Sequence, residues 1–222
     1  MKTVTGLLLM DVDGTLIQEE VINLLGKEAG QEEEIVAITA AAMAGQLDFK
    51  TALVQRVSLL AGLPTSVFEK VSQSLHLHKG AKKLITEMKE RGYKIGLVSG
   101  GFHEIIDDLA ATLEIDYVKA NRLEINCGRL TGSVIGEVVT QQTKADCLKR
   151  WADENGLRLS QTIAVGDGAN DLLMVQQAGF GIAYCAKPVL KEVADDHIDQ
   201  PDLGLVLDCL DSYPVSPRKR QA

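Results

Sequence analysis

Short, continuously apolar segments recur along the chain, and helical patterns lie between them. The apolar segments cover residues 5–10, 93–98, 162–165 and 181–184. Such segments are typical of strands that are buried on both faces of a parallel sheet. Strands that alternate with helices predict an α/β fold with a doubly wound parallel sheet of Rossmann type.

Three helical patterns follow this alternation, and a glycine ends each of them. They cover residues 80–91, 143–155 and 171–178. Glycine is favoured directly after a helix because it adopts left-handed backbone angles without a steric penalty. These glycines therefore support both the helices and the positions at which they end.

Residues 18–75 interrupt the alternation of strands and helices. Four helical patterns occupy this segment, at residues 21–29, 31–44, 49–61 and 64–74, and no strand pattern lies between them. We therefore predict a small helical cap over residues 18–75, inserted into an α/β core formed by residues 1–17 and 76–222. A second insertion, residues 122–139, alternates apolar and polar positions between glycines, which predicts a β-hairpin or meander.

The composition agrees with an α/β core and restricts the partners. The 222 residues include 1 Trp, 4 Tyr and 4 Phe, while 45% of the residues are hydrophobic. A core of Leu, Val, Ile and Ala suits an α/β fold better than an aromatic-rich β-sandwich. Lys and Arg number 23 and Asp and Glu 31, so the net charge is −8. An acidic chain argues against nucleic acid or an anionic membrane as the main partner.

Several features of the sequence favour the cytoplasm. No segment approaches the roughly 18 apolar residues that a membrane span needs. The apolar stretch at residues 6–10 is too short for the core of a signal peptide, and Asp11 follows it directly. The four cysteines are scattered without a Cys-x-x-Cys pair, which is typical of reduced thiols. We expect the basic residues at 217–220 to form a frayed, solvated terminus.

Two acidic motifs directly follow predicted strands. Residues 11–15 read Asp-Val-Asp-Gly-Thr, and residues 166–171 read Gly-Asp-Gly-Ala-Asn-Asp. Ligands of parallel sheets gather at the carboxyl ends of the strands, so Asp11, Asp13 and Asp167 form a cluster if the two strands are neighbours. An oxygen-only cluster of this kind suits a hard cation that keeps several waters, and Mg²⁺ fits best.

When two carboxylates lie close together, the pKa of one of them is raised. The pair then contains one ionised group and one proton carrier. A plain polar turn is the alternative for the first motif.

Further groups add the means to bind an anion. Residues 98–102 read Val-Ser-Gly-Gly-Phe, which predicts a turn whose hydroxyl and N–H groups form an anion cradle before a helix. Lys144, at the start of a predicted helix, adds a positive charge. Alone, these features are compatible with an ordinary turn and a surface lysine; together they fit phosphoryl transfer.

The motifs, in this order, resemble those of the haloacid dehalogenase superfamily, and nearly the whole chain resembles its phosphoserine phosphatase family. Stretches outside the motifs also match, at residues 28–30, 56–60, 120–123, 130–132, 136–138 and 186–191. Gly14 is a departure, because phosphoserine phosphatases often have serine there, although glycine is usual in the superfamily. The resemblance implies a Rossmann-type core with a helical cap. Because the chain starts directly at the first strand, we expect it to lack the N-terminal regulatory domain that some members of the family carry.

The resemblance also implies roles for residues of the core. Asp11 would attack phosphorus and become an aspartyl-phosphate, and Asp13 would donate a proton and later accept one. Mg²⁺ would be held by Asp11, the backbone of Asp13 and Asp167. The other implied roles are phosphate contacts from Ser99, Gly100, Lys144 and Asn170, and support of the site from Gly101 and Asp171.

In the cap, the resemblance implies residues that select the substrate. Glu20 would bind an ammonium group, and Arg56 would bind a carboxylate through its planar, two-pronged guanidinium. Met43 and Phe49 match apolar residues that close over the substrate. Without the resemblance, the two charged residues would be interpreted as solvated helix charges and the two apolar ones as cap core.

The implied activity is the Mg²⁺-dependent hydrolysis of O-phospho-L-serine to L-serine and phosphate, the final step of serine biosynthesis. One alternative is a phosphatase or phosphotransferase of the same superfamily that acts on phosphothreonine or phosphohomoserine. Another is a phosphate-binding protein without catalysis, against which the presence of both Asp11 and Asp13 argues. The sequence leaves the oligomeric state open.

Overall fold

The computed structural model describes residues 3–43 and 46–212 of the chain. Its sheet has the strand order β4 (Arg129–Ile135), β3 (Tyr117–Asn126), β2 (Tyr93–Phe102), β1 (Gly6–Met10), β5 (Thr162–Gly166), β6 (Phe180–Tyr184), β7 (Asp196–Ile198). The central strand β1 (Gly6–Met10) is parallel to both of its neighbours, β2 (Tyr93–Phe102) and β5 (Thr162–Gly166). All the residues of β1 are buried, as expected for a continuous apolar run in the middle of a parallel sheet.

The other strands extend this sheet to its two edges. β3 (Tyr117–Asn126) lies parallel to β2, and β4 (Arg129–Ile135) forms an antiparallel hairpin with β3. On the opposite side, β6 (Phe180–Tyr184) and β7 (Asp196–Ile198) are parallel to β5 and to each other. The predicted α/β fold with a mostly parallel sheet and a hairpin insertion is therefore confirmed.

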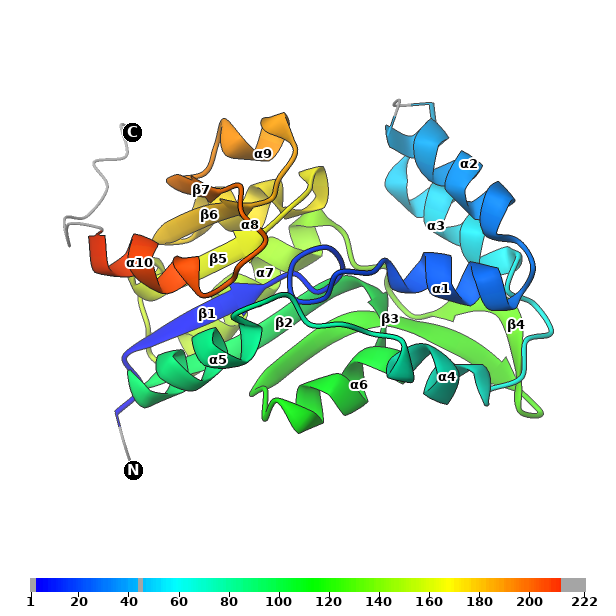
Figure 1. The fold of residues 1–222 in the computed structure, drawn as a ribbon, viewed down its shortest axis with the longest axis horizontal. Helices are drawn as coiled ribbons and strands as arrows, with labels where there is room; N and C mark the ends of the chain where they lie inside the picture. The colour runs from blue at the N-terminus through cyan, green and yellow to red at the C-terminus, as the bar shows by residue number, and fades with distance from the viewer. Residues whose placement is uncertain (1–2, 44–45, 213–222) are drawn as a thin grey trace.

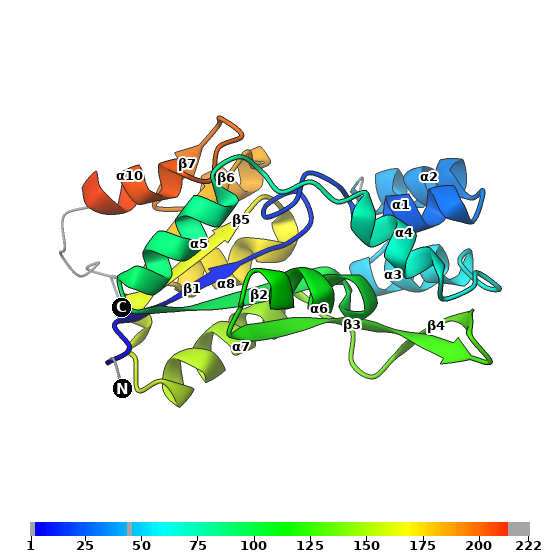
Figure 2. The same cartoon turned by 60° about the horizontal axis from the view of Figure 1, so that its bottom comes forward.

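Hydrophobic cores lie on both faces of the sheet, because successive residues of a strand point to opposite faces. Leu8 and Met10 belong to one core, and Leu7 and Leu9 to the other. The helices on the first face are α5 (Ala81–Glu90), α6 (His103–Thr112) and α10 (Leu205–Ser212). The helices on the second face are α7 (Gln141–Glu154), α8 (Leu172–Gln177) and α9 (Pro188–Lys191). Figure 2 shows α5 and α7 on opposite sides of the sheet.

The inserted helices lie beyond the carboxyl ends of the central strands (Figure 1). They are α1 (Val21–Glu28), α2 (Glu32–Met43), α3 (Phe49–Ser58) and α4 (Val67–Gln73), and each falls within one of the predicted helical patterns. The segment after α3 is also hydrogen bonded to the hairpin. The Gly62 N–H donates to the Leu130 carbonyl at 2.8 Å, and the Leu130 N–H donates to the Leu63 carbonyl at 2.9 Å. The insertion is thus joined to the edge strand β4 as well as to the chain segments that enter and leave it.

Some of the sheet differs from the sequence-based prediction. β2 continues through a bulge to Phe102, whereas we predicted a turn after residue 98. β3 begins at Tyr117, ahead of the hairpin predicted from residue 122. β7 was not predicted because it is very short and only Ile198 of its residues is buried, so it leaves no apolar run in the sequence.

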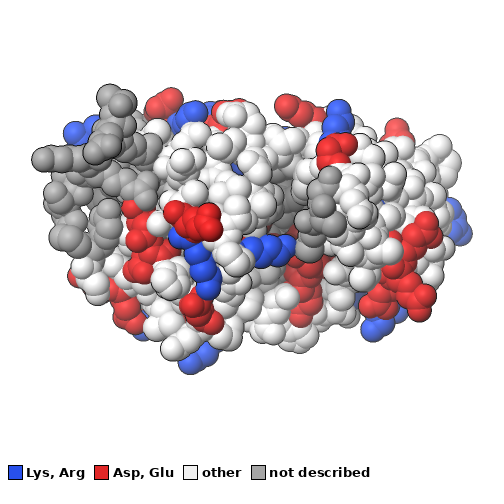
Figure 3. All heavy atoms as spheres, turned by 90° about the horizontal axis from the view of Figure 1, so that it is seen from above, with Lys and Arg blue, Asp and Glu red and all other residues white. Residues whose placement is uncertain are grey.

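Charged side chains of both signs share the described surface. On the face seen from above, Lys and Arg side chains are interspersed with Asp and Glu, and the described part of this face has no extended basic area (Figure 3). Among the helices that the structure describes, none has the length and apolar character needed to cross a membrane. The basic residues at 217–220 lie outside the described residues.

Candidate active site

The carboxyl ends of β1 and β5 are side by side, and this places the two acidic motifs together. Met10 pairs with Val165, and the Asp11 N–H continues the ladder by donating to the Val165 carbonyl at 3.0 Å. Asp11 and Asp167 therefore leave neighbouring strands at the same edge of the sheet. A cavity of about 650 Å³ opens there, lined by this edge and by residues of α1, α2 and α3.

Lys144 of α7 is buried between two carboxylates. Its Nζ lies 2.8 Å from Asp11 Oδ1 and 2.7 Å from Asp171 Oδ1, and its side chain is 1% exposed. Burial alone would lower the pKa of Lys144, but the charges of Asp11 and Asp171 and their hydrogen bonds outweigh it, so the pKa lies above its ordinary value. Lys144 is therefore an ammonium ion at neutral pH, and it holds both carboxylates in place.

Asp171 also fixes the loop that follows β5. Its Oδ2 accepts the N–H groups of Asp167 and Gly168 at 3.1 and 3.2 Å, and its side chain is fully buried. Both amides belong to the loop that carries Asp167. The position of the Asp167 carboxylate thus depends on Asp171, which in turn is held by Lys144.

Three carboxylates converge closely enough to hold a metal ion. One oxygen from each of Asp11, Asp167 and Asp171 lies within 4.8 Å of the others. Burial, followed by the charges of Asp11 and Glu20, raises the pKa of Asp167 to about 7. This concentration of negative charge on oxygen ligands fits a hard divalent cation. The structure adds Asp171 to the carboxylates expected here, while the backbone of Asp13 is still a predicted ligand.

Asp13 lies in a different environment from the carboxylates of this cluster. A Cβ on Gly101 would lie 2.9 Å from Asp13 Oδ2, so the carboxyl group packs against the bulge of β2. Its Oδ1 is buried and has no hydrogen-bond partner among the described residues. Burial, then the charges of Glu20 and Asp11, raises the pKa of Asp13 well above its ordinary value, although a hydrogen bond from Val21 acts in the opposite direction. A carboxyl group in this environment can carry a proton at neutral pH.

The predicted anion cradle lies in the bulge of β2 rather than in a turn after the strand. Gly100 and Gly101 line the cavity, and Ser99 is buried with 1% exposure. The Gly101 N–H donates to Ser99 Oγ at 2.7 Å. From the loop after β5, Asn170 Nδ2 donates to Asp11 Oδ2 at 3.3 Å. The bulge and Asn170 therefore border the same cavity as Asp11.

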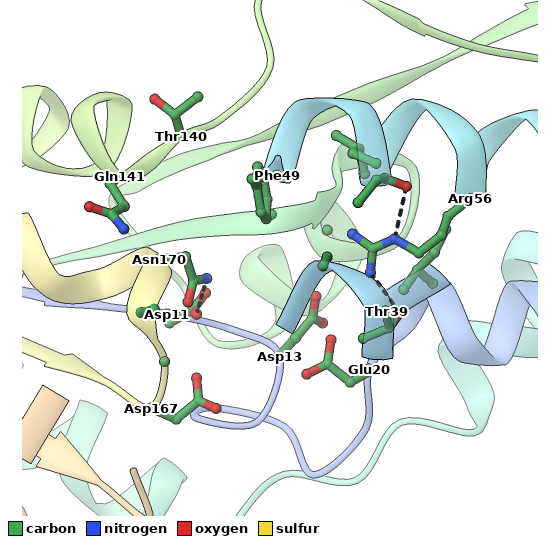
Figure 4. Close-up of a pocket in the computed structure, with 18 of the residues that line it drawn as sticks. Asp11, Asp13, Glu20, Thr39, Phe49, Arg56, Thr140, Gln141, Asp167 and Asn170 are labelled. Carbon is green, nitrogen blue, oxygen red and sulfur yellow. Dashed lines mark hydrogen bonds between the residues drawn. The ribbon is translucent and has the colours of Figure 1, made fainter. Parts of the chain in front are cut away.

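Glu20 and Arg56 reach this cavity from the inserted segment (Figure 4). Arg56 Nε donates to the Ala52 carbonyl at 3.2 Å, and Nη1 donates to Thr39 Oγ1 at 3.3 Å, so α2 and α3 together fix the guanidinium plane. Glu20 is exposed on the side of the cavity. Burial by the surrounding protein, and then the charge of Asp11, raise the pKa of Glu20, while the charge of Arg56 lowers it. An acid and a base thus stand on the wall that faces the core carboxylates.

One apolar residue spans the cavity from the cap side. Phe49 begins α3, and a Cβ on Gly100 would lie 3.4 Å from Phe49 Cζ. The ring is 39% exposed and contacts the bulge of the core. The side chain of Met43, the second apolar residue predicted here, lies outside the described part of the structure.

The cavity wall also includes polar residues that were not predicted: Thr39, Thr140, Gln141, Gln142 and Lys187. Lys187 belongs to the segment after β6, and its backbone N–H donates to the Asp167 carbonyl at 3.0 Å. Its positive charge lowers the pKa values of both Asp167 and Glu20. Because β6 was predicted, the rule that ligands bind at strand ends could have identified Lys187.

Comparisons with known proteins extend over nearly the whole chain. Residues 8–176 match the family model of the haloacid dehalogenase-like hydrolases. The chain is 59% identical to a phosphoserine phosphatase of Streptococcus thermophilus, over 95% of this chain and 98% of the relative. It is 45% identical to a phosphoserine phosphatase of Methanocaldococcus jannaschii, over 93% and 98%. A solved phospho-aspartyl intermediate analogue of a phosphoserine phosphatase superposes with a TM-score of 0.88 at 44% identity, over 93% of this chain and 99% of that one.

If this cluster holds a divalent cation, its binding should be linked to the ionisation of Asp167, and Mg²⁺ is the probe that tests this. Near pH 6.5, below the pKa of about 7, much of Asp167 carries a proton that a cation must displace. The affinity for Mg²⁺ should therefore fall as the pH is lowered through about 7. Calorimetric titration with Mg²⁺ alone, in buffers of different ionisation enthalpy, measures both the affinity and the released protons.

Two variants separate this effect from general surface charge. Asp167→Asn should bind Mg²⁺ weakly and lose the proton release. Asp108→Asn removes an exposed carboxylate of α6 that does not line the cavity, and it should behave as the wild type. An Mg²⁺ affinity that is constant between about pH 6 and 8 would contradict the assignment.

Proposed function

The chain belongs to the haloacid dehalogenase-like hydrolases, and from this premise we propose that it hydrolyses O-phospho-L-serine to L-serine and phosphate, the final step of serine biosynthesis. One observation carries the proposal. The cavity combines buried core carboxylates suited to phosphoryl transfer with an acid and a base, Glu20 and Arg56, on the wall that faces them. Phosphoserine has the matching three groups: a phosphate, an ammonium and a carboxylate.

Asp11 is the nucleophile of this reaction. Its Oδ1 is held by Lys144 at 2.8 Å and by the Val12 N–H at 2.7 Å, while Oδ2 has a longer contact, 3.3 Å, with Asn170. Oδ2 is therefore the oxygen that is less engaged, and we assign the attack to it. A bond forms between Oδ2 and phosphorus while the bond from phosphorus to the serine oxygen breaks.

Asp13 moves the protons. Its raised pKa keeps a proton available, which it donates to the departing serine oxygen. The carboxylate that results takes a proton from a water molecule, and that water attacks phosphorus. The bond between phosphorus and Asp11 then breaks, which releases phosphate and restores both side chains.

The cation of this site is Mg²⁺ in our proposal, held by Asp11, Asp167 and the backbone carbonyl of Asp13, with Asp171 beside them. Bound there, it offsets the negative charge of the carboxylates and of the phosphate. The phosphate contacts come from Ser99, Gly100, Lys144 and Asn170, with Gly101 supporting the bulge. These groups come from β2, α7 and the loop after β5, and the distances above support their convergence.

The substrate is selected from the cap. Glu20 binds the ammonium group, and Arg56, whose plane is already fixed by α2 and α3, binds the carboxylate through two N–H groups. Phe49 covers the site. The sequence resemblance assigns the same role to Met43. Residues 18–75 act as the cap of a core formed by residues 1–17 and 76–222. A cytoplasmic location is supported by four free cysteines.

The role of Asp13 predicts a dependence on the leaving group. Asp13→Asn should slow phosphoserine hydrolysis by about 10²–10⁴-fold, because the serine alkoxide leaves poorly without a proton. Hydrolysis of p-nitrophenyl phosphate should lose much less, since its leaving group needs no proton. Initial rates with both substrates measure the difference. Equal losses on the two substrates would remove the proton-transfer role from Asp13.

The substrate itself is tested by kcat/KM for phosphoserine, phosphothreonine, phosphoethanolamine and phosphoglycerate with Mg²⁺ present. Phosphoserine should be preferred, because each of the others adds, deletes or replaces one recognition group. A clear preference for a different compound would replace phosphoserine as the substrate while leaving the phosphatase chemistry intact.

Arg56→Ala should lower kcat/KM for phosphoserine by roughly 10- to 150-fold, since a charge-assisted contact is worth about 1.5–3 kcal/mol. Phosphoethanolamine, which has no carboxylate, should lose little. Arg56→Lys should recover only part of the activity, because an ammonium cannot make the two-pronged contact. Arg150→Ala removes an exposed arginine that does not line the cavity and should change neither substrate. Equal losses on both substrates would assign Arg56 a structural role.

A further inference from the structure

The backbone of the cradle in β2 needs hydrogen-bond partners that the backbone pairing of the sheet does not supply. Val98 pairs with Lys119, and the next paired residues are Phe102 and Asn121. Residues 99–101 of β2 therefore lie opposite a single residue of β3. Backbone groups inside such a bulge lose their ladder partners, and other groups must satisfy them.

Asn121 supplies one hydrogen bond to the bulge and makes a second one outside it. It is 2% exposed, its Nδ2 donates to the Gly100 carbonyl at 2.8 Å, and its Oδ1 accepts the Val139 N–H at 2.8 Å. The orientation of the carboxamide is fixed, because a flip would set its oxygen against the carbonyl and its NH₂ against the N–H. In the Asn121 carboxamide, Nδ2 therefore serves as the donor and Oδ1 as the acceptor.

The contact with Gly100 acts on the neighbouring peptide N–H. The Gly100 carbonyl and the Gly101 N–H belong to one planar trans peptide, so they point to opposite sides. Asn121 holds the carbonyl on one side, and the N–H donates to Ser99 Oγ at 2.7 Å on the other. Because Ser99 Oγ accepts this hydrogen bond, its own proton is free to be donated elsewhere.

We propose that Asn121 is a positioning residue for phosphate binding: by fixing the peptide between Gly100 and Gly101, it keeps the Ser99 hydroxyl in the role of donor to the phosphate. This inference rests on the proposed function, in which the bulge of β2 holds the phosphate. The second contact, with Val139, reaches the segment that leads directly into α7, which carries Lys144. One carboxamide thus fixes two phosphate-binding segments relative to each other.

The variants are chosen to remove these contacts without removing a group that touches the phosphate. Asn121→Leu has a similar size and cannot make either hydrogen bond. Asn155→Leu is the matched control, because Asn155 Nδ2 donates to Tyr117 Oη at 2.8 Å and to the Trp151 carbonyl at 2.7 Å, in a partly buried position outside the cavity. Both variants lose two hydrogen bonds of one asparagine.

The measurements are the affinity for inorganic phosphate by calorimetry with Mg²⁺ present, and kcat/KM for phosphoserine and p-nitrophenyl phosphate. Asn121→Leu should weaken phosphate binding and lower kcat/KM for both substrates by about 10- to 100-fold, because the cradle is displaced from its productive geometry. Asn155→Leu should lower the urea midpoint of unfolding and leave these quantities at wild-type values.

A double-mutant cycle with Ser99→Ala tests whether Asn121 acts through Ser99. Once Ser99→Ala has removed the hydroxyl, Asn121→Leu should cause a further loss of no more than about threefold. A loss of the same size with and without Ser99→Ala would make Asn121 a structural residue and overturn the proposal. Wild-type phosphate affinity in Asn121→Leu would overturn it as well.

The test still decides the role of Asn121 if a variant does not fold or if phosphoserine is not the substrate. If Asn121→Leu does not fold, Asn121→Ser, whose side chain is too short to span both partners, enters the same cycle with the same expectations. If phosphoserine is not hydrolysed while p-nitrophenyl phosphate is, the substrate proposal fails, and the cycle with p-nitrophenyl phosphate and inorganic phosphate still decides the role of Asn121.

Discussion

Lys144 places a buried positive charge at a point where separate parts of the chain bring carboxylates together. A charge removed from water is tolerated only when it is paired, and an unpaired partner is strongly unfavourable. The contacts to Asp11 and Asp171 therefore tie together the end of β1, the first turns of α7 and the loop after β5. Because Asp171 also binds the amides of that loop, the position of Asp167 follows from the same charge. The geometry of the carboxylate cluster thus depends on the contacts of one lysine.

Two aspartates only two positions apart acquire different chemistry from what surrounds them. Asp11 lies 2.8 Å from the Lys144 ammonium and accepts a hydrogen bond from Asn170 Nδ2. Asp13 is half-buried near Glu20, with one inaccessible oxygen that has no hydrogen-bond partner among the described residues, and there the protonated form is favoured. The strand end separates the two by directing alternate residues to different surroundings. In the proposed mechanism, one residue type thus supplies both the nucleophile and the proton carrier, without a histidine.

The sequence was sufficient for features that depend on short-range patterns. The central strands, the inserted helices and the acidic motifs were predicted because apolar runs, helical spacing and strand ends are visible locally. The bulge of β2 was interpreted as a turn, since Ser-Gly-Gly is common in turns, and its nature depends on pairing with β3. Asn121 joins Gly100 and Val139, which are distant along the chain, so no local pattern indicates its role. Lys187 differs in this respect, because it follows the predicted strand β6 and the rule that ligands bind at strand ends could have indicated it.

The hydrogen bonds between the segment after α3 and the β4 hairpin bear on how such a protein can acquire a new specificity. Gly62 and Leu63 add to the outer edge of the sheet, and Gly132 permits α3 to approach, because a Cβ there would lie 3.1 Å from the Ser58 carbonyl oxygen. The helical insertion is consequently not a detachable module. Removing it would open the outer edge of β4, and any replacement would have to restore the same pairing with the hairpin. Changes of substrate in this architecture are more accessible through single residues on α1, α2 and α3 than through recombination of entire caps.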